Sequence, residues 1–214
     1  MSQSLYDLLQ AGHDGSGRIY GVVIGIVTNN KDPDGLGRVK LKFPWLSDTE
    51  GSDWARVVSP MAGSARGLYL LPEVEDHVLV AFEHGDPAYP FVIGGLWDGK
   101  RKPPATNSDG KNDLRLLKSR SGHLIRLDDK DGEEKIEILD KSGKNSIVIT
   151  TKDNSIAIKA DADIKITSAN GKLVVEAKGI ELKSNAAITV EASSNLELKA
   201  KSQTTIKGSA VNIN

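Results

Sequence analysis

The C-terminal part of the chain decides its fold, because it repeats every eight positions. Residues 155–214 read SIAIKADA-DIKITSAN-GKLVVEAK-GIELKSNA-AITVEASS-NLELKAKS-QTTIKGSA-VNIN. Nearly every octad carries two apolar residues separated by one residue, and residues two apart in a strand point to the same face. Small and charged residues, which suit exposed turns, fill the other positions. The pattern predicts stacked short strands, as in a β-solenoid.

An octad is too short to build a solenoid from one chain. Single-chain solenoid repeats need roughly 20 residues or more to wrap around a core. Three chains, each covering one side and rotating by a third of a turn per repeat, would close a prism and leave no lateral strand edge. We therefore predict a homotrimeric, intertwined β-helix with the apolar pairs in its core. These residues are Ile156, Ile158, Ile164, Ile166, Leu173, Val175, Ile180, Leu182, Ile188, Val190, Leu196, Leu198 and Ile206.

The same paired pattern begins earlier with a wider spacing. Four pairs lie about eleven residues apart, and turn clusters occupy 119–122, 128–132 and 140–143. We expect the rod to start near residue 113 and to become slimmer from about residue 156. The four pairs are Leu114/Leu116, Ile125/Leu127, Ile136/Ile138 and Ile147/Ile149.

Composition divides the chain and limits its function. All ten aromatic residues lie before position 98, and all eight prolines lie by Pro104. The 28 basic and 29 acidic residues almost balance, which argues against a protein that mainly neutralises phosphate. There is no cysteine for a disulfide or a thiolate metal site. Residues 1–12 do not resemble a signal peptide, and no apolar run approaches the roughly 18–20 residues of a membrane span. Synthesis in the cytoplasm is the expectation.

Residues 18–98 show strand signals at short spacing. The stretch 38–43 alternates strictly, with Val39, Leu41 and Phe43 on one face and basic residues on the other. We expect strands at 19–28, 38–43, 54–59, 67–71, 77–83 and 90–96, which together fit a small barrel of OB type. The polar stretch 99–112 reads as a linker to the rod at 113–214. Residues 1–17 contain a short possible helix at 4–11, with Leu5, Leu8 and Leu9 on one side.

Several separate runs, in this order, resemble a known family. They resemble the OB domain and needle start of contractile-tail spike proteins, namely the VgrG and phage baseplate protein V family. The resemblance extends from about residue 18 to the end of the chain. The runs are GRVKLKFPW at 37–45, DWAR at 53–56, SPMA at 59–62, GLYLLPE at 67–73, VAFEHGDP at 80–87, SGHLI at 121–125, IEI at 136–138 and DKSG at 140–143.

The resemblance implies the central spike of a contractile injection machine, carried in a virion or a phage-tail-like particle. No hub domain of several hundred residues precedes the barrel, which implies a separate baseplate hub protein, and we expect Leu5, Leu8 and Leu9 to dock there. No lysozyme domain is inserted, so no enzymatic activity and no cofactor are expected. No histidine follows His123, so a metal-holding tip is not expected and a separate PAAR-type tip protein is implied. It would dock on Val211, Asn212, Ile213 and Asn214, with transient membrane contact on firing.

Three clusters carry a possible site chemistry, and each has a simpler structural interpretation. His77 and His84 with Glu83 and Asp86 suggest a metal, but their spacing puts the histidines on opposite faces of a strand. Glu73, Glu75 and Asp76 offer acid/base carboxylates, but they follow Pro72 in a turn. The acidic run 128–134 has the composition of a calcium loop without its ligand spacing. We predict no catalytic and no metal-binding residues.

The main alternative is an OB protein that binds nucleic acid and carries a repetitive oligomerising tail. Arg38, Lys40 and Lys42 lie beside Phe43 and Trp45, and OB barrels bind strands through basic grooves and stacked aromatics. However, Phe43 falls on the opposite face from the basic residues. An enzyme on a rod is the third interpretation, and the sequence offers no nucleophile and base for it.

Overall fold

The computed structural model describes residues 17–46 and 51–212 and divides the chain into two units, with the boundary in the sequence between Asp161 and Ala162. The described part is all-β, and its one helical element is a 3₁₀ turn, η1 (Glu83–Gly85). The possible helix at 4–11, with Leu5, Leu8 and Leu9, lies outside the described residues. Ile213 and Asn214 lie outside them as well.

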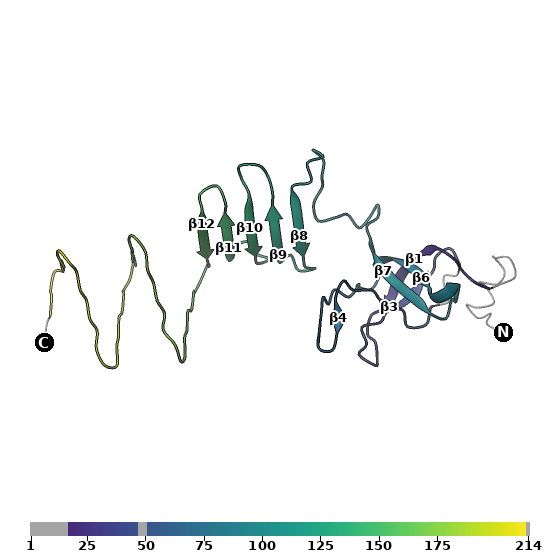
Figure 1. Cartoon of the computed structure of the whole chain (residues 1–214), viewed down its shortest axis with the longest axis horizontal. Helices are drawn as coiled ribbons and strands as arrows, with labels where there is room; N and C mark the ends of the chain where they lie inside the picture. The colour runs from purple at the N-terminus through teal and green to yellow at the C-terminus, as the bar shows by residue number, and fades with distance from the viewer. Residues whose placement is uncertain (1–16, 47–50, 213–214) are drawn as a thin grey trace. The chain divides into compact units, whose positions relative to one another are not determined.

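Five strands of the first unit form a curled sheet (Figure 1). They are β1 (Val22–Asn29), β2 (Lys40–Lys42), β3 (Arg56–Val57), β6 (His77–Phe82) and β7 (Pro90–Leu96), in the order β2-β1-β6-β7-β3. All neighbours are antiparallel except β3 and β7, which are parallel.

The two edges of this sheet meet through the segment that leads into β3. The Val39 amide donates to the Ala55 carbonyl at 3.0 Å, and the Ala55 amide donates back at 2.8 Å. The Ser52 amide donates to the Leu41 carbonyl, and the Ser52 hydroxyl accepts from the Leu41 amide, so this buried serine is satisfied. The curled sheet with joined edges confirms the expected OB-type barrel.

The barrel interior confirms the alternation expected in 38–43. Val39, Leu41 and Phe43 are at most 1% exposed, whereas Lys40 and Lys42 on the other face are half-buried. The Phe43 ring lies 5.8 Å from that of Phe82. The remaining buried apolar residues are Ile19, Val27, Ala55, Val78, Val80 and Val92.

Two expected strands are much shorter than the sequence suggested. The strand expected at 54–59 is reduced to β3, and the one at 67–71 to Gly67, which pairs in a small hairpin of β4 (Ala62–Gly63) and β5 (Arg66–Gly67). Pro60 has no amide to donate to a ladder. The Ser59 hydroxyl contacts the carbonyls of Met61 and Leu68 and holds the hairpin as a projecting loop.

Five further strands of the first unit form an antiparallel meander. They are β8 (Leu114–Lys118), β9 (Leu124–Asp128), β10 (Lys135–Leu139), β11 (Ser146–Thr150) and β12 (Ser155–Lys159), in sequence order. The eleven-residue spacing is therefore one strand plus one reversing turn. Gly132 and Gly143 occupy these turns with φ of 72° and 69°, which a residue with a Cβ adopts at a cost.

Cross-strand pairing confirms that three of the four widely spaced pairs share a face. Ile136 lies opposite Ile149 and Leu127, and Ile138 lies opposite Ile147 and Ile125. The first pair is different, because Leu116 lies opposite Arg126 on the other face and Leu117 lies opposite Ile125. The run Leu114-Arg-Leu-Leu117 has leucines on both faces of the strand. The spacing of the pairs alone therefore selected the wrong face.

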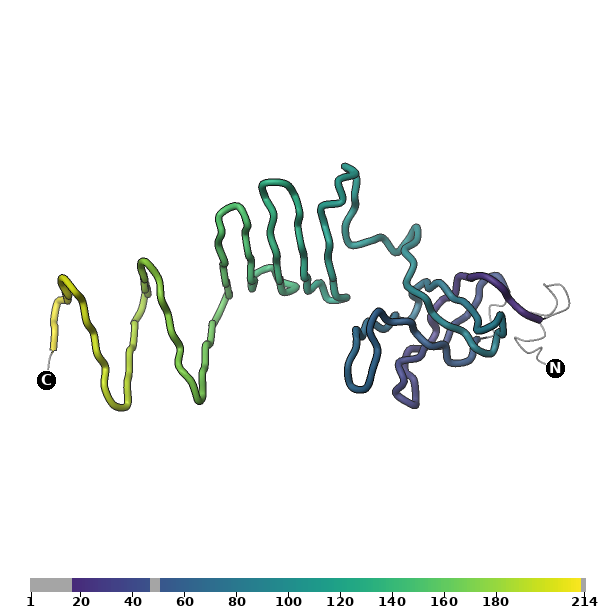
Figure 2. The backbone as a smooth tube through the Cα atoms, viewed as in Figure 1, coloured from purple at the N-terminus to yellow at the C-terminus, as the bar shows by residue number. Residues whose placement is uncertain are grey.

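The octads differ from the meander in one decisive respect. Ile156 and Ile158 belong to β12 and pair with β11, so the first octad forms the last strand of the meander. From 160 to 212 no strand is assigned, and bends recur near residues 161, 170, 178, 185, 193, 201 and 209. Figure 2 shows this unit as a zigzag of extended runs. The stacked β-helix is therefore not formed within one chain, and it stays a prediction.

The barrel predicts a steric effect at Gly25. A Cβ at this buried position would lie 3.2 Å from the Val80 side chain and 3.3 Å from the Phe43 ring. We expect Gly25→Val to overpack the core and to destabilise the barrel by about 1–3 kcal/mol in thermal unfolding. Gly94→Val is the control, since nothing lies within 4 Å of a Cβ there. Equal stability of the two variants would contradict the packing described.

Candidate subunit interface and docking surfaces

The first candidate surface is one face of the β8–β12 meander, here called the apolar face. Its members lie between 40% and 69% exposed in the single chain. Contiguous apolar surface of this kind marks an interaction site in a soluble protein. The apolar face consists of Leu117, Ile125, Leu127, Ile136, Ile138, Ile147, Ile149, Ile156 and Ile158.

The opposite face of the same sheet carries a charged cluster that is paired within the chain. Glu137 is 7% exposed there and lies opposite Arg126, whose Nε donates to the Glu137 carboxylate at 2.6 Å. Lys135 adds a longer ion pair at 3.6 Å. The two faces therefore differ in composition, because this face carries a cluster of ion pairs and the other face carries a contiguous set of large apolar side chains.

The octads present a second surface without a partner. Their predicted core residues from Ile164 to Ile206 are 55% to 73% exposed. From Ala162 to Asn212, none of the backbone amides and carbonyls hydrogen-bond to one another. Extended backbone normally pairs in a sheet, so both the apolar side chains and the backbone edges of this segment remain available to other chains.

Charged side chains lie on the other side of these extended runs. Glu181 and Lys183 form an ion pair at 2.6 Å, and so do Glu197 and Lys199. Each pair flanks the second apolar residue of its octad, so both members leave the strand on the side away from it. The contrast agrees with an inward apolar row and an outward charged row.

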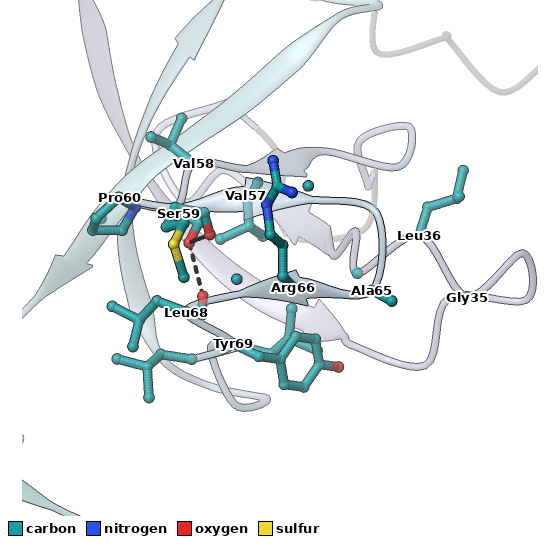
Figure 3. Close-up of a pocket in the computed structure, with 18 of the residues that line it drawn as sticks. Gly35, Leu36, Val57, Val58, Ser59, Pro60, Ala65, Arg66, Leu68 and Tyr69 are labelled. Carbon is teal, nitrogen blue, oxygen red and sulfur yellow. Dashed lines mark hydrogen bonds between the residues drawn. The ribbon is translucent and has the colours of Figure 1, made fainter.

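The barrel has a cleft of about 880 Å³ beside the β4–β5 hairpin (Figure 3). Val57, Val58, Leu68 and Tyr69 line it, and Arg66 is the one charged side chain among its described lining residues. The hairpin depends on Gly67, because a Cβ there would lie 2.7 Å from the Met61 carbonyl oxygen.

The outer side of β1, β6 and β7 carries an apolar strip that the sequence reasoning missed. Val22 lies opposite Ala81, and Ile24 lies opposite Leu79; Val22 and Ile24 are 56% and 51% exposed. A signal was present, since residues 22–27 read VVIGIV and are apolar at both strand parities. That pattern is typical of a strand covered on both faces.

The structure separates the residues that suggested a metal site. His77 Nδ1 contacts the Asp98 carboxylate at 3.1 Å, at the end of the barrel. Backbone and side-chain donors from Arg101, with the Lys100 amide, hold the pKa of Asp98 well below its usual range. His84 lies in η1, where its carbonyl accepts from Arg18. No group of three metal-ligating side chains occurs in residues 17–46 and 51–212.

The other two acidic clusters shape turns, as expected. The Asp76 carboxylate accepts from the Glu73 amide at 2.9 Å, and Glu73 pairs with Arg120 at 2.6 Å. In the turn between β9 and β10, Lys130 pairs with Glu133 at 2.7 Å, which raises the pKa of the lysine and lowers that of the glutamate. These contacts use the carboxylates for local structure.

The basic row proposed for nucleic acid is largely paired within the barrel. Arg38 binds the Asp32 carboxylate at 2.7 Å and the Asp34 carboxylate at 2.5 Å, and the contact with Arg38 lowers the pKa of Asp32. Lys40 lies over the Trp54 ring at 5.5 Å. Phe43 is 1% exposed and so offers no stacking surface. The arrangement disfavours a basic groove with stacked aromatics.

Among the described residues, no helix has the length and hydropathy of a membrane span.

Comparison with known proteins identifies the barrel. Residues 23–97 match the family model of the type VI secretion system and phage-baseplate injector OB domain. The chain is 37% identical over 82 residues to the type VI secretion system spike protein VgrG3 of Vibrio cholerae. It is 30% identical over 145 residues to spike protein VgrG1a of Pseudomonas aeruginosa, and 30% identical over 122 residues to the actin cross-linking toxin VgrG1 of V. cholerae.

These alignments cover part of each protein. They take in 36%, 59% and 54% of this chain, and 8%, 22% and 10% of VgrG3, VgrG1a and the toxin VgrG1, respectively. The chain therefore spans less than a quarter of the length of each relative. Together the matches support a VgrG-like assignment for the chain and an injector-type OB domain for its barrel.

Proposed function

We propose that this VgrG-like chain, with its injector-type OB barrel, is the central spike of a contractile injection machine. In this proposal three copies form one spike, and the rod transmits the force of sheath contraction to the target envelope. The family assignment supports a place in a contractile injection machine, and the exposed apolar surfaces support the association of three copies. The spike would belong to a virion or a phage-tail-like particle and would act by stiffness rather than by chemistry.

One observation carries the trimer. The apolar residues of the octads are more than half exposed, and their extended backbone makes no hydrogen bonds to itself between Ala162 and Asn212. Neither condition is stable in water for so long a segment. Most runs present their large apolar residues on one side, and Val174 between Leu173 and Val175 is the exception. The simplest closed arrangement therefore places three such sides around an axis.

Two aspartate substitutions, made in separate variants at neighbouring positions, test the trimer. Ile166 is inward in the proposed trimer and Thr167 is outward, yet both are exposed in the single chain. Ile166→Asp would bury three carboxylates at one level, at a cost on the order of several kcal/mol each, so we expect loss of the trimer in light scattering. Thr167→Asp is the matched control, with an expected change within about 0.5 kcal/mol. A wild-type monomer would exclude the trimer, and equal behaviour of the two variants would exclude the inward position of Ile166.

We also propose that the C-terminal end of the spike binds a PAAR-type tip protein. Val211 is 50% exposed and continues the octad pattern, and open strand edges accept further strands from a partner. Three copies would present a small platform formed by Val211, Asn212, Ile213 and Asn214.

Removal of residues 209–214 should abolish co-purification of a tip protein encoded beside the spike. The trimer should persist, because the earlier octads keep their apolar pairs. Thr205→Ala is the control, since it alters an exposed position before the platform and should leave binding intact. Full tip binding by the shortened chain would rule out the platform.

The N-terminal end is proposed to bind a baseplate hub protein. Leu5, Leu8 and Leu9 offer one apolar contact, and the exposed strip around Val22 and Ile24 on the barrel offers another. An apolar strip on a barrel whose own core is already filled is available for a partner.

Deletion of residues 1–17, or Ile24→Glu, should weaken incorporation into particles and leave the barrel folded. Ile24 points away from the core, so the substitution removes apolar surface without a cavity. Thr28→Glu is the control, on the same strand and also exposed. Pull-down with the hub protein measures the effect, and normal assembly of both altered chains would contradict the docking role.

A further inference from the structure

The meander and the octads differ in whether consecutive segments of the chain pair with each other. In the meander each strand pairs with the next strand of the same chain, as β10 does with β11. Between Ala162 and Asn212 consecutive extended runs share no backbone hydrogen bond, and Figure 2 shows them splayed in a zigzag. The partner of an octad is therefore not the next octad of its own chain.

The proposed trimer, on which this inference rests, fixes the neighbours of each octad. If every chain moves to the next side of the prism with each repeat, an octad and the following octad of another chain occupy one side in succession. All chains climb in the same direction, so these neighbours run parallel. Strands in a sheet lie about 4.8 Å apart, which brings equivalent octad positions of different chains into contact.

The outward positions have complementary charges in this arrangement. The position after the second apolar residue holds Lys183, Glu191, Lys199 and Lys207 in four octads spaced by eight residues, so the charge alternates across the first three. The position between the two apolar residues holds Glu181, Thr189 and Glu197, so an uncharged residue separates the two glutamates. Opposite charges on neighbouring strands stabilise a sheet, and like charges directly opposite destabilise it.

We propose that Glu191 is the central residue of a charge ladder that sets the register of the three chains. Glu191 of one chain lies between Lys183 of a second copy and Lys199 of the third. Within the described part of a single chain Glu191 forms no ion pair, whereas Lys183 and Lys199 each bind the glutamate two residues before them. The ladder therefore adds a partner for Glu191 and extends two existing pairs across subunits.

The ladder selects one register out of several that the apolar pairs would accept. Ile188 and Val190 differ little from Leu196 and Leu198 as core residues, so a chain displaced by one octad would bury a similar apolar area. A one-octad displacement of one chain would place Lys183 of one copy beside Lys199 of another, or the Glu191 side chains of two copies beside each other. Repeated apolar strands are prone to such slippage, and outward charges oppose it.

Substitutions in one strand test the charges. Glu191→Lys leaves four lysines in succession in this column, because Lys207 follows Lys199, and should lower the melting temperature of the trimer. Thr189→Lys places a lysine between Glu181 and Glu197 and should leave the melting temperature unchanged or raise it. Both effects should shrink in about 1 M salt, where the Debye length is about 3 Å. Equal shifts in both variants would overturn the ladder.

Cysteine cross-linking tests the neighbours directly, because the chain has no cysteine of its own. In the double variant E191C/K199C, neighbouring parallel positions about 4.8 Å apart fall within the Cα separation of a disulfide. Oxidation joins two thiols with loss of two electrons and two protons to the added oxidant, diamide. Three such links close a ring, so we expect a covalent trimer in a denaturing gel that reverts to monomer on reduction.

The controls separate the alternatives. Glu191→Cys alone and Lys199→Cys alone should stay monomeric in the gel, and a dimer from either would overturn the register. A cross-linked double variant that runs as a monomer would show that octads stack within one chain, which also overturns it. Light scattering before oxidation distinguishes the two proposals. A trimer without the 191–199 link refutes the ladder alone, whereas a monomer refutes the trimer itself.

Discussion

The structure depends on one constraint: a strand of five or six residues offers a single thin apolar strip, and one chain has nothing to place against it. The barrel escapes this constraint because its sheet curls and fills its own interior with Val39, Leu41 and Phe43. The strands of the meander form an open row, and no strand is assigned in the octads from 160 to 212, so the apolar strips of both stay exposed. Association with other chains would cover these apolar strips. The hydrogen bonds between chains that complete the sheet would also make the rod stiff. Folding and function would then rest on the same contacts.

The barrel could be predicted closely where sequence and packing carry the same signal. Val39, Leu41 and Phe43 alternate with lysines and are buried as expected, and the strand at 90–96 has the predicted bounds. Prediction failed where local geometry overrides propensity. Residues 68–71 are apolar enough for a strand, but Pro60 and the Ser59 hydroxyl turn the preceding chain into a projecting hairpin.

The rod shows a different limit of sequence reasoning. Spacing identified the pairs from Ile125 to Ile149 but misplaced the first pair, because only the antiparallel register reveals that Leu117 rather than Leu116 faces Ile125. The exterior strip around Ile24 was also missed, since an apolar residue in a barrel strand is assigned to the core by default. Both errors concern which face a residue occupies, and that is fixed by neighbouring strands rather than by the residue itself.

The change of spacing from eleven to eight explains why the chain stops pairing with itself. In the meander, five strand residues leave six for a reversing turn, and Gly132 and Gly143 adopt positive φ there. An octad with an extended run of about six residues leaves only two for a bend, and none of the glycines between Ala162 and Asn212 has positive φ. Figure 2 shows the runs splayed in a zigzag, and no backbone hydrogen bond joins one run to the next. The next run is therefore carried away from its predecessor, and the space beside each run is left for a strand of another chain.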